Sequence, residues 1–225
     1  MYQKGSISMI QNVTLREKVC NYLREELARG SLVPGAYIDQ NAICDSLDIS
    51  RAPLRDALIQ LEAEQFVEIL PRRGVLIKKL TLQDIKNSYE IIGALESTML
   101  LSDSKKIRQV DIVKLEEINA QLNKFLENKR FNMYYELNLE FHDVFLGLSD
   151  NTLLNHILRP LKQRLFDFPR MKYDQQWELV NLVEHQRITE SIKAGNLEAA
   201  ACIIKYEHWS FAHHRENLIK VYRLG

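Results

Sequence analysis

Glycine and proline are concentrated near one end of this chain, and that distribution constrains the fold more than any other feature. Four of the eight glycines and three of the five prolines lie within the first 74 residues. Both residue types interrupt regular helices. Most of the remaining chain follows the 3.6-residue apolar period of amphipathic helices. The sequence therefore predicts two domains, residues 1–80 and 81–225, of which residues 1–12 are expected to be flexible.

Composition excludes several classes of protein. With 46% hydrophobic and 27% charged residues, the chain is typical of folded proteins rather than disordered ones. No stretch approaches the ~18 uncharged apolar residues of a membrane span, and the N-terminal segment lacks the apolar run of a secretory signal. Cys20, Cys44 and Cys202 are odd in number and far apart, which argues against a disulfide scaffold. We expect a cytoplasmic protein without membrane contacts.

Capping signals predict three helices in the first domain. Thr14 and Glu17 form the pattern of a capping box, and Gly30 ends the first helix. A short second helix and a third helix over residues 51–64 follow, and Ser50 is expected to cap the third.

The apolar period then changes from 3.6 to two. The runs Phe66–Leu70 and Val75–Ile77 flank a turn that contains Gly74, which predicts a β-hairpin. From Thr81 onward the chain shows about six helices, enough for an independent bundle. We therefore expect a mostly α protein in which an N-terminal winged helix-turn-helix, made of three helices and a β-hairpin, precedes an all-α helical bundle.

Two arginines on the third helix indicate DNA binding. Leu54 and Leu58 are expected in the core, which leaves Arg51 and Arg55 one turn apart on the opposite face, where a recognition helix reaches base edges. The arginine fork can bond O6 and N7 of guanine together. Alternatively, the two arginines belong to an ordinary solvated face. The net charge does not decide, since residues 1–80 hold 11 basic and 10 acidic residues, a balance of +1.

The turn of the hairpin carries a second cationic group. Arg72 and Arg73 lie at its tip, and Gly74 permits a close approach to the DNA backbone or minor groove. Ser50 can offer its hydroxyl or backbone N–H to a phosphate.

One pattern spans residues 14–78: Gly30-x-x-x-Pro34-Gly35, Leu47-x-Ile49-Ser50-Arg51-x-Pro53-Leu54-Arg55-Asp56-Ala57-Leu58, Leu61-Glu62 and Gly74-x-x-Ile77. It resembles the winged-helix domain of the GntR family of bacterial transcription regulators. The resemblance implies that Ser50, Arg51, Arg55 and Arg73 contact DNA.

The second domain contains Glu140-Phe141-His142 and Glu184-His185-x-x-Ile188-x-x-Ser191-Ile192-x-x-Gly195-Asn196. These residues resemble the all-helical effector domain of the FadR subgroup of GntR regulators, the FCD type, over residues 82–215. The resemblance implies a homodimer, a small-molecule effector such as an organic acid, and a divalent metal held by an aspartate and three histidines.

The metal ligands of that family carry over incompletely. Asn138 stands where the family has aspartate, His142 and His185 match two histidines, and the family spacing places the last ligand at Glu207 although a histidine stands at His208. At ~100° per residue either side chain can point inward. Such a set suits zinc, nickel, manganese or iron(II). The alternative that His142 and His185 are hydrogen-bonded core histidines remains open.

Other positions also depart from the family. Ile92 replaces an arginine, so we expect a ligand that is less acidic or that is bound differently. His156, His213 and His214 are expected at the surface.

The leading hypothesis is a ligand-responsive transcription regulator, usually a repressor in this family, that binds double-stranded operator DNA. One alternative is a metal-dependent hydrolase that uses the C-terminal histidine cluster. The sequence shows no nucleophile motif and no glycine-rich phosphate loop, which argues against an enzyme. The other alternative is a ligand-independent DNA-binding protein.

Overall fold

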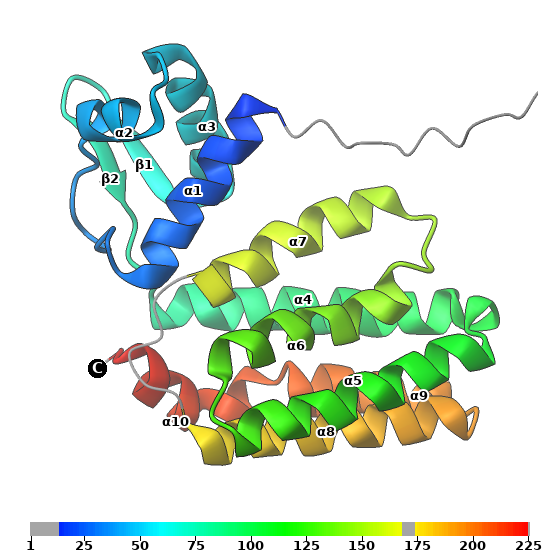
Figure 1. Ribbon diagram of the computed structural model, residues 1–225. Coiled ribbons are helices and arrows are strands. Elements are labelled where there is room, and N and C mark those ends of the chain that lie inside the picture. The colour runs from blue at the N-terminus through cyan, green and yellow to red at the C-terminus, as the bar shows by residue number, and fades with distance from the viewer. Residues whose placement is uncertain (1–13, 168–173, 225) are drawn as a thin grey trace, which may run out of the picture. The chain divides into compact units, whose positions relative to one another are not determined.

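The computed structural model describes residues 14–167 and 174–224, and the segment expected to be flexible, residues 1–12, lies outside them. The chain separates into two compact units (Figure 1): unit 1 ends at Lys79 and unit 2 begins at Leu80. The predicted fold class is confirmed, because three helices and a hairpin precede a helical bundle.

Unit 1 is a winged helix-turn-helix whose ends are set by local sequence. Thr14 and Glu17 form the predicted capping box, and Gly30 adopts a left-handed φ of 80° that favours glycine. The strands pair antiparallel, with Val67 opposite Ile77. The elements are α1 (Leu15–Arg29), α2 (Gln40–Leu47), α3 (Arg51–Ala63), β1 (Val67–Leu70) and β2 (Gly74–Ile77).

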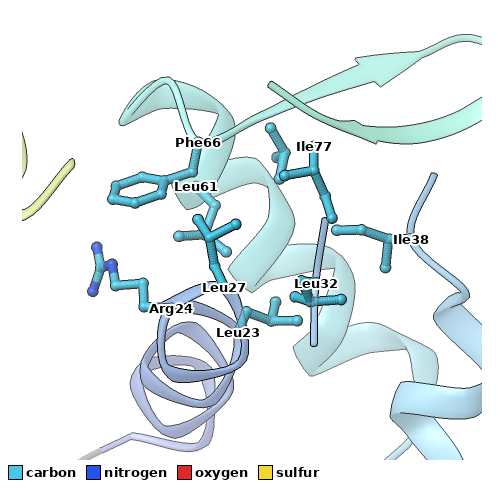
Figure 2. Close-up of a pocket in the computed structure, with 9 residues that line it drawn as sticks. Leu23, Arg24, Leu27, Leu32, Ile38, Leu61, Phe66 and Ile77 are labelled. Carbon is cyan, nitrogen blue, oxygen red and sulfur yellow. The ribbon is translucent and has the colours of Figure 1, made fainter. Parts of the chain in front are cut away.

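The core of unit 1 joins α1 and α3 to the hairpin. At its edge the Arg24 guanidinium carbon lies 5.4 Å from the centroid of the Phe66 ring, and Arg24 also pairs with Glu64. This packing holds α3 against the hairpin, so the exposed faces of the two elements are fixed relative to each other. The labelled apolar side chains in Figure 2 are Leu23, Leu27, Leu32, Ile38, Leu61, Phe66 and Ile77.

Unit 2 is an all-α bundle. In it α5 packs against α6 and α8, while α4 packs against α7 and α9. No helix within residues 14–167 and 174–224 is long and apolar enough to cross a membrane. The elements are α4 (Leu82–Ser102), a 3-10 turn (Ser104–Lys106), α5 (Gln109–Glu127), α6 (Phe131–Leu146), α7 (Thr152–Asp167), α8 (Gln175–Lys193), α9 (Leu197–Ile203), a π-helical turn (Ile204–His208) and α10 (Phe211–Tyr222).

Leu58→Ala is expected to destabilise unit 1 by about 2–5 kcal/mol, because it opens a cavity in the core. Leu58 is 2% exposed, whereas its neighbour Ile59 is 52% exposed. Ile59→Ala should therefore change stability by less than about 0.5 kcal/mol. Amide hydrogen exchange of the full chain, read over α1 and α3, measures both variants. Equal exchange rates in the two would contradict the expected core.

Candidate functional site

The N-terminal half of α3 presents cationic side chains to solvent. Leu54 is fully buried, whereas Arg51 and Arg55, three residues before it and one after it, are both exposed. Arg51 Nη2 donates to Asn41 Oδ1 at 2.6 Å. The side chain of Arg55 is 75% exposed and lies 3.9 Å from Asp56 Oδ1. Arg55 can therefore reach a partner outside the protein with little desolvation.

Ser50 occupies the N-cap position of α3 without capping it through its side chain. Its backbone is extended, with ψ of 169°, but its hydroxyl makes no capping hydrogen bond. The predicted cap is thus correct for the backbone position and wrong for the hydroxyl. The hydroxyl can instead donate a hydrogen bond to a phosphate at this helix N-terminus.

The tip of the hairpin carries the other predicted residues. Arg72 and Arg73 are exposed, and Arg73 Nη2 lies 3.4 Å from the Tyr37 hydroxyl. Arg72 and Gly74 have φ of 62° and 107°. A Cβ at Gly74 would meet only an ordinary 3.6 Å contact with the Tyr37 ring. The backbone conformation, rather than lack of space, therefore favours glycine at this turn.

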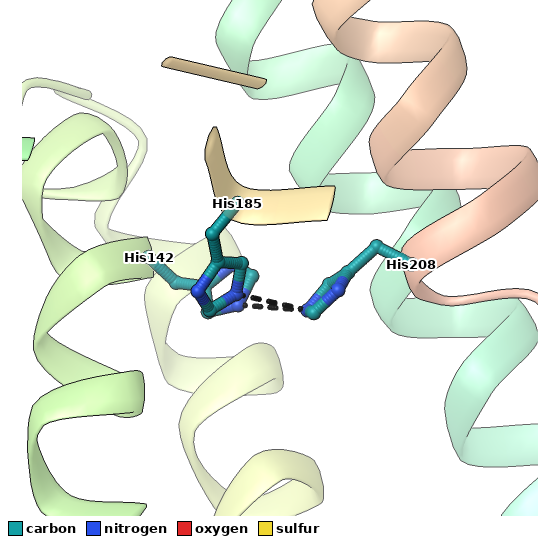
Figure 3. A group of neighbouring side chains, drawn as sticks. All are labelled: His142, His185 and His208. Carbon is teal, nitrogen blue, oxygen red and sulfur yellow. Dashed lines mark hydrogen bonds between the residues drawn. The ribbon is translucent and has the colours of Figure 1, made fainter. Parts of the chain in front are cut away.

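Three histidines converge in the interior of unit 2 (Figure 3). His142 comes from α6, His185 from α8 and His208 from the π-helical turn, and all three are buried. His208 Nε2 lies 3.1 Å from His142 Nε2 and 3.4 Å from His185 Nε2. Imidazole nitrogens bound to one tetrahedral zinc lie roughly 3.3 Å apart, given zinc–nitrogen bonds of about 2.0–2.1 Å. Both of these spacings are therefore those of ligands of one ion, and the ligand atoms of the three histidines all lie within 4.8 Å of one another.

Two buried carboxylates orient two of these rings. Glu96 Oε2 lies 2.8 Å from His142 Nδ1, and Glu184 Oε2 lies 2.9 Å from His208 Nδ1. An ionised carboxylate only accepts hydrogen bonds, so in the neutral rings each Nδ1 carries the proton and each Nε2 presents a lone pair. Lone pairs that face one another across 3.1 Å need a cation between them.

The pKa shifts keep two of the three rings, His142 and His185, in the neutral form. Burial lowers the pKa of His142 to about 4 and takes the pKa of His185 well below its ordinary value. Burial alone would raise the pKa of Glu96, but His142 and Lys162 hold it well below its usual range. Neutral imidazoles backed by a charged carboxylate are donors that suit a divalent transition metal.

The two remaining predicted ligands, Asn138 and Glu207, have different surroundings. Asn138 lies one helical turn before His142, is buried, and its Oδ1 has no hydrogen-bond partner among the residues described. Glu207 instead pairs with Arg187, whose Nη2 lies 3.0 Å from Glu207 Oε1. Of the two alternatives for the last position, His208 lies with the other histidines and Glu207 does not.

The π-helical turn explains this outcome. Trp209 N donates to Ile204 O at 2.9 Å, a bond that spans five residues instead of four. Each residue of such a wide turn rotates by less than the ~100° of an α-helix, so directions estimated from a regular helix do not apply. Gly93 in α4 makes room for the turn, because a Cβ there would lie 2.9 Å from Trp209 Cβ.

Glu96 is one of the two buried carboxylates whose role the sequence did not reveal. It is fully buried and accepts hydrogen bonds from Lys162 Nζ at 3.0 Å and Trp209 Nε1 at 2.8 Å, in addition to its contact with His142. The available signal was its position one turn after the buried Ile92 on α4. A charged residue on an apolar helix face requires buried partners.

The prediction that His214 lies at the surface is wrong. His214 is 1% exposed, and its Nδ1 accepts a hydrogen bond from Trp177 Nε1 at 2.9 Å. In the neutral ring the proton is therefore on Nε2, 3.6 Å from Glu184 Oε1. Glu184, His213 and His214 are close enough to hold an ion, but this tautomer of His214 cannot be a ligand. His156 and His213 are exposed as expected.

Comparisons with known proteins agree with both units. The family model "Bacterial regulatory proteins, gntR family" matches residues 15–77, and the FCD domain model matches residues 87–208. YdhC, an HTH-type transcriptional regulator of Bacillus subtilis, is 28% identical over 80% of this chain and 81% of its own length. The gluconate operon transcriptional repressor of the same organism is 24% identical over 86% of this chain and 81% of its own.

Similarity to solved structures concerns the fold. The structure of Escherichia coli McbR/YncC superposes with a TM-score of 0.74 at 18% identity and covers 94% of this chain and 98% of that one.

Glu96→Ala should lower the free energy of unfolding of unit 2 by about 3–5 kcal/mol, because it leaves the charge of Lys162 buried without its carboxylate. Glu116→Ala is the control: it breaks a surface pair with Lys193, whose side chain is 57% exposed, and should cost at most about 1 kcal/mol. Urea denaturation followed by tryptophan fluorescence reports on unit 2, which contains both tryptophans. Similar urea midpoints for the two variants would show that the buried contacts of Glu96 do not stabilise unit 2.

Proposed function

The chain is a transcription regulator of the GntR family with an FCD domain, and from this premise we propose that it is a repressor that responds to a small molecule bound by unit 2. Relatives named as transcriptional regulators and repressors support this function over a metal-dependent hydrolase.

The exposed face of α3 is the observation that carries the proposal. Arg51 and Arg55 stand near the N-terminus of a helix whose other face is buried, which is how a recognition helix presents side chains to the major groove. In this arrangement Arg55 forms hydrogen bonds with a guanine, while Ser50 and the hairpin tip contact the DNA backbone or minor groove. The proposed DNA contacts are Ser50, Arg51, Arg55, Arg72, Arg73 and Gly74.

We infer that the regulator acts as a homodimer on a pseudo-palindromic operator in the cytoplasm. One short recognition helix reads too few base pairs to select a site among genomic competitors, so two copies are needed. Sedimentation at micromolar concentration measures the oligomeric state; a monomer that binds the operator with full affinity would contradict the dimer.

The three-histidine centre is proposed to hold a divalent metal ion. His142, His185 and His208 supply imidazole nitrogens, and the unpartnered Asn138 Oδ1 is the candidate fourth ligand. Zinc, nickel, manganese and iron(II) suit this donor set. Such an ion supplies a Lewis-acidic position for an oxygen of the effector. The chain itself fixes the tautomers of His142 and His208 through the two buried carboxylates.

Effector binding is proposed to reach unit 1 through the short connection of residues 78–81, which separates Ile77 from Leu82. Close to it, Arg164 of α7 lies 3.4 Å from Asp84 near the start of α4. A movement of α7 can thus act on the beginning of α4. By reciprocity, operator DNA must change effector affinity by the factor with which the effector changes operator affinity.

Arg55→Ala should weaken binding to the specific operator by about 1–3 kcal/mol and leave binding to random DNA almost unchanged, because it removes a base contact. Arg29→Ala, at an exposed arginine that ends α1, is the control and should change neither affinity. Fluorescence anisotropy with both DNA types measures the difference. Equal losses on operator and random DNA would show that Arg55 contacts only phosphate.

Chelation should lower the melting temperature of freshly purified protein, because a metal bound only to the native state stabilises it. At a free metal concentration of 100 times Kd this stabilisation is about 2.7 kcal/mol. His185→Asn should abolish the response to chelator, whereas His156→Asn, at an exposed position, should retain it. Metal-free protein by elemental analysis, with a melting temperature that chelation leaves unchanged, would identify the three histidines as core residues.

A further inference from the structure

We propose that the groove between α6 and α7 binds small organic anions that carry an apolar body, at a place separate from the three-histidine centre. The groove has a volume of about 580 Å³, within the roughly 300–1,000 Å³ of small-molecule sites. The inference rests on the proposed function only where it makes this anion the effector; the binding itself does not depend on DNA.

The two walls of the groove differ in chemistry. Asn155, Arg159 and Lys162 are spaced four and three residues apart, so they follow one face of α7. Leu139 and Leu146 of α6 line the other side, together with the carboxylate of Asp143. A ligand with a charged end and an apolar end can therefore satisfy both walls at once.

The polar wall carries two cations: Lys162, which is buried and paired with Glu96, and Arg159, which is exposed. Lys162 Nζ lies 3.0 Å from Glu96 Oε1 and 3.8 Å from Asp143 Oδ1. An ammonium group has three donors, so Lys162 keeps donors beyond the one that Glu96 accepts. Arg159 is exposed, and no residue in the described part of the chain forms a hydrogen bond or ion pair with it. An arginine fork matches the two oxygens of a carboxylate.

The groove does not share its lining with the three-histidine centre. His142, His185 and His208 are absent from the residues that line it. Glu96 stands between the two places, with Oε1 on Lys162 and Oε2 on His142. An anion in the groove therefore binds without coordinating an ion at the histidines, and chelator-treated protein can test it.

Hexanoate is a suitable probe, and titration calorimetry on the full chain in excess chelator is the measurement. We expect saturable binding of one hexanoate per chain, and binding of hexan-1-ol at least tenfold weaker because the alcohol lacks the charge. Arg159→Gln should weaken hexanoate binding at least tenfold. Leu139→Trp, which fills the groove and keeps its charges, should abolish it. Arg215→Gln, at an exposed arginine of α10, is the matched control and should leave the affinity within about twofold.

Several results would overturn the proposal: no saturable binding up to about 10 mM hexanoate, equal affinity for hexan-1-ol, binding that survives both groove variants, or binding that disappears on chelation. If only the proposed function fails, the result differs from those four. Hexanoate would then bind with the expected dependence on Arg159 but leave operator affinity unchanged, which supports the site while removing its role as the effector site.

Discussion

A carboxylate with no exposure to solvent governs the arrangement of unit 2. An unpaired buried charge costs several kcal/mol, so Glu96 requires donors wherever α4 places it. Three elements meet that demand: α6 with His142, α7 with Lys162 and the segment after the π-helical turn with Trp209. Apolar packing alone tolerates small slides between helices, whereas these directional bonds fix the register of three elements against one side chain. The candidate metal centre and the anion groove lie on two sides of it.

Local chemistry explains why most of the fold could be predicted. Capping boxes at Thr14 and Thr81 mark the starts of α1 and α4, and both are present with their acidic partners three residues later. The change of apolar period marks the hairpin, and periodicity identifies the exposed face of α3 around Arg55. These signals lie within a few residues of the structure they determine, so no knowledge of distant packing is needed.

The candidate site could be predicted less completely from the sequence, because its geometry depends on distant partners and on an irregular turn. Lys162 and Glu96 are 66 residues apart, and His214 is buried against Trp177, 37 residues away. No local pattern encodes such pairings. The choice between Glu207 and His208 stayed open for a different reason, since the estimate assumed a constant rotation per residue at a turn where the chain departs from it.

The π-helical turn also affects how relatives of this chain are aligned. A relative with a regular α-helix at this point needs one residue fewer to bring its ligand to the same place in space. An alignment without a gap then puts that ligand in the column of Glu207, and the histidine of this chain looks lost although it is only displaced. A one-residue insertion, absorbed as a wider turn, keeps the side chain in position. The ligand of the relative and the histidine of this chain are therefore equivalent in space. A sequence alignment pairs them only if it places a gap inside the helix.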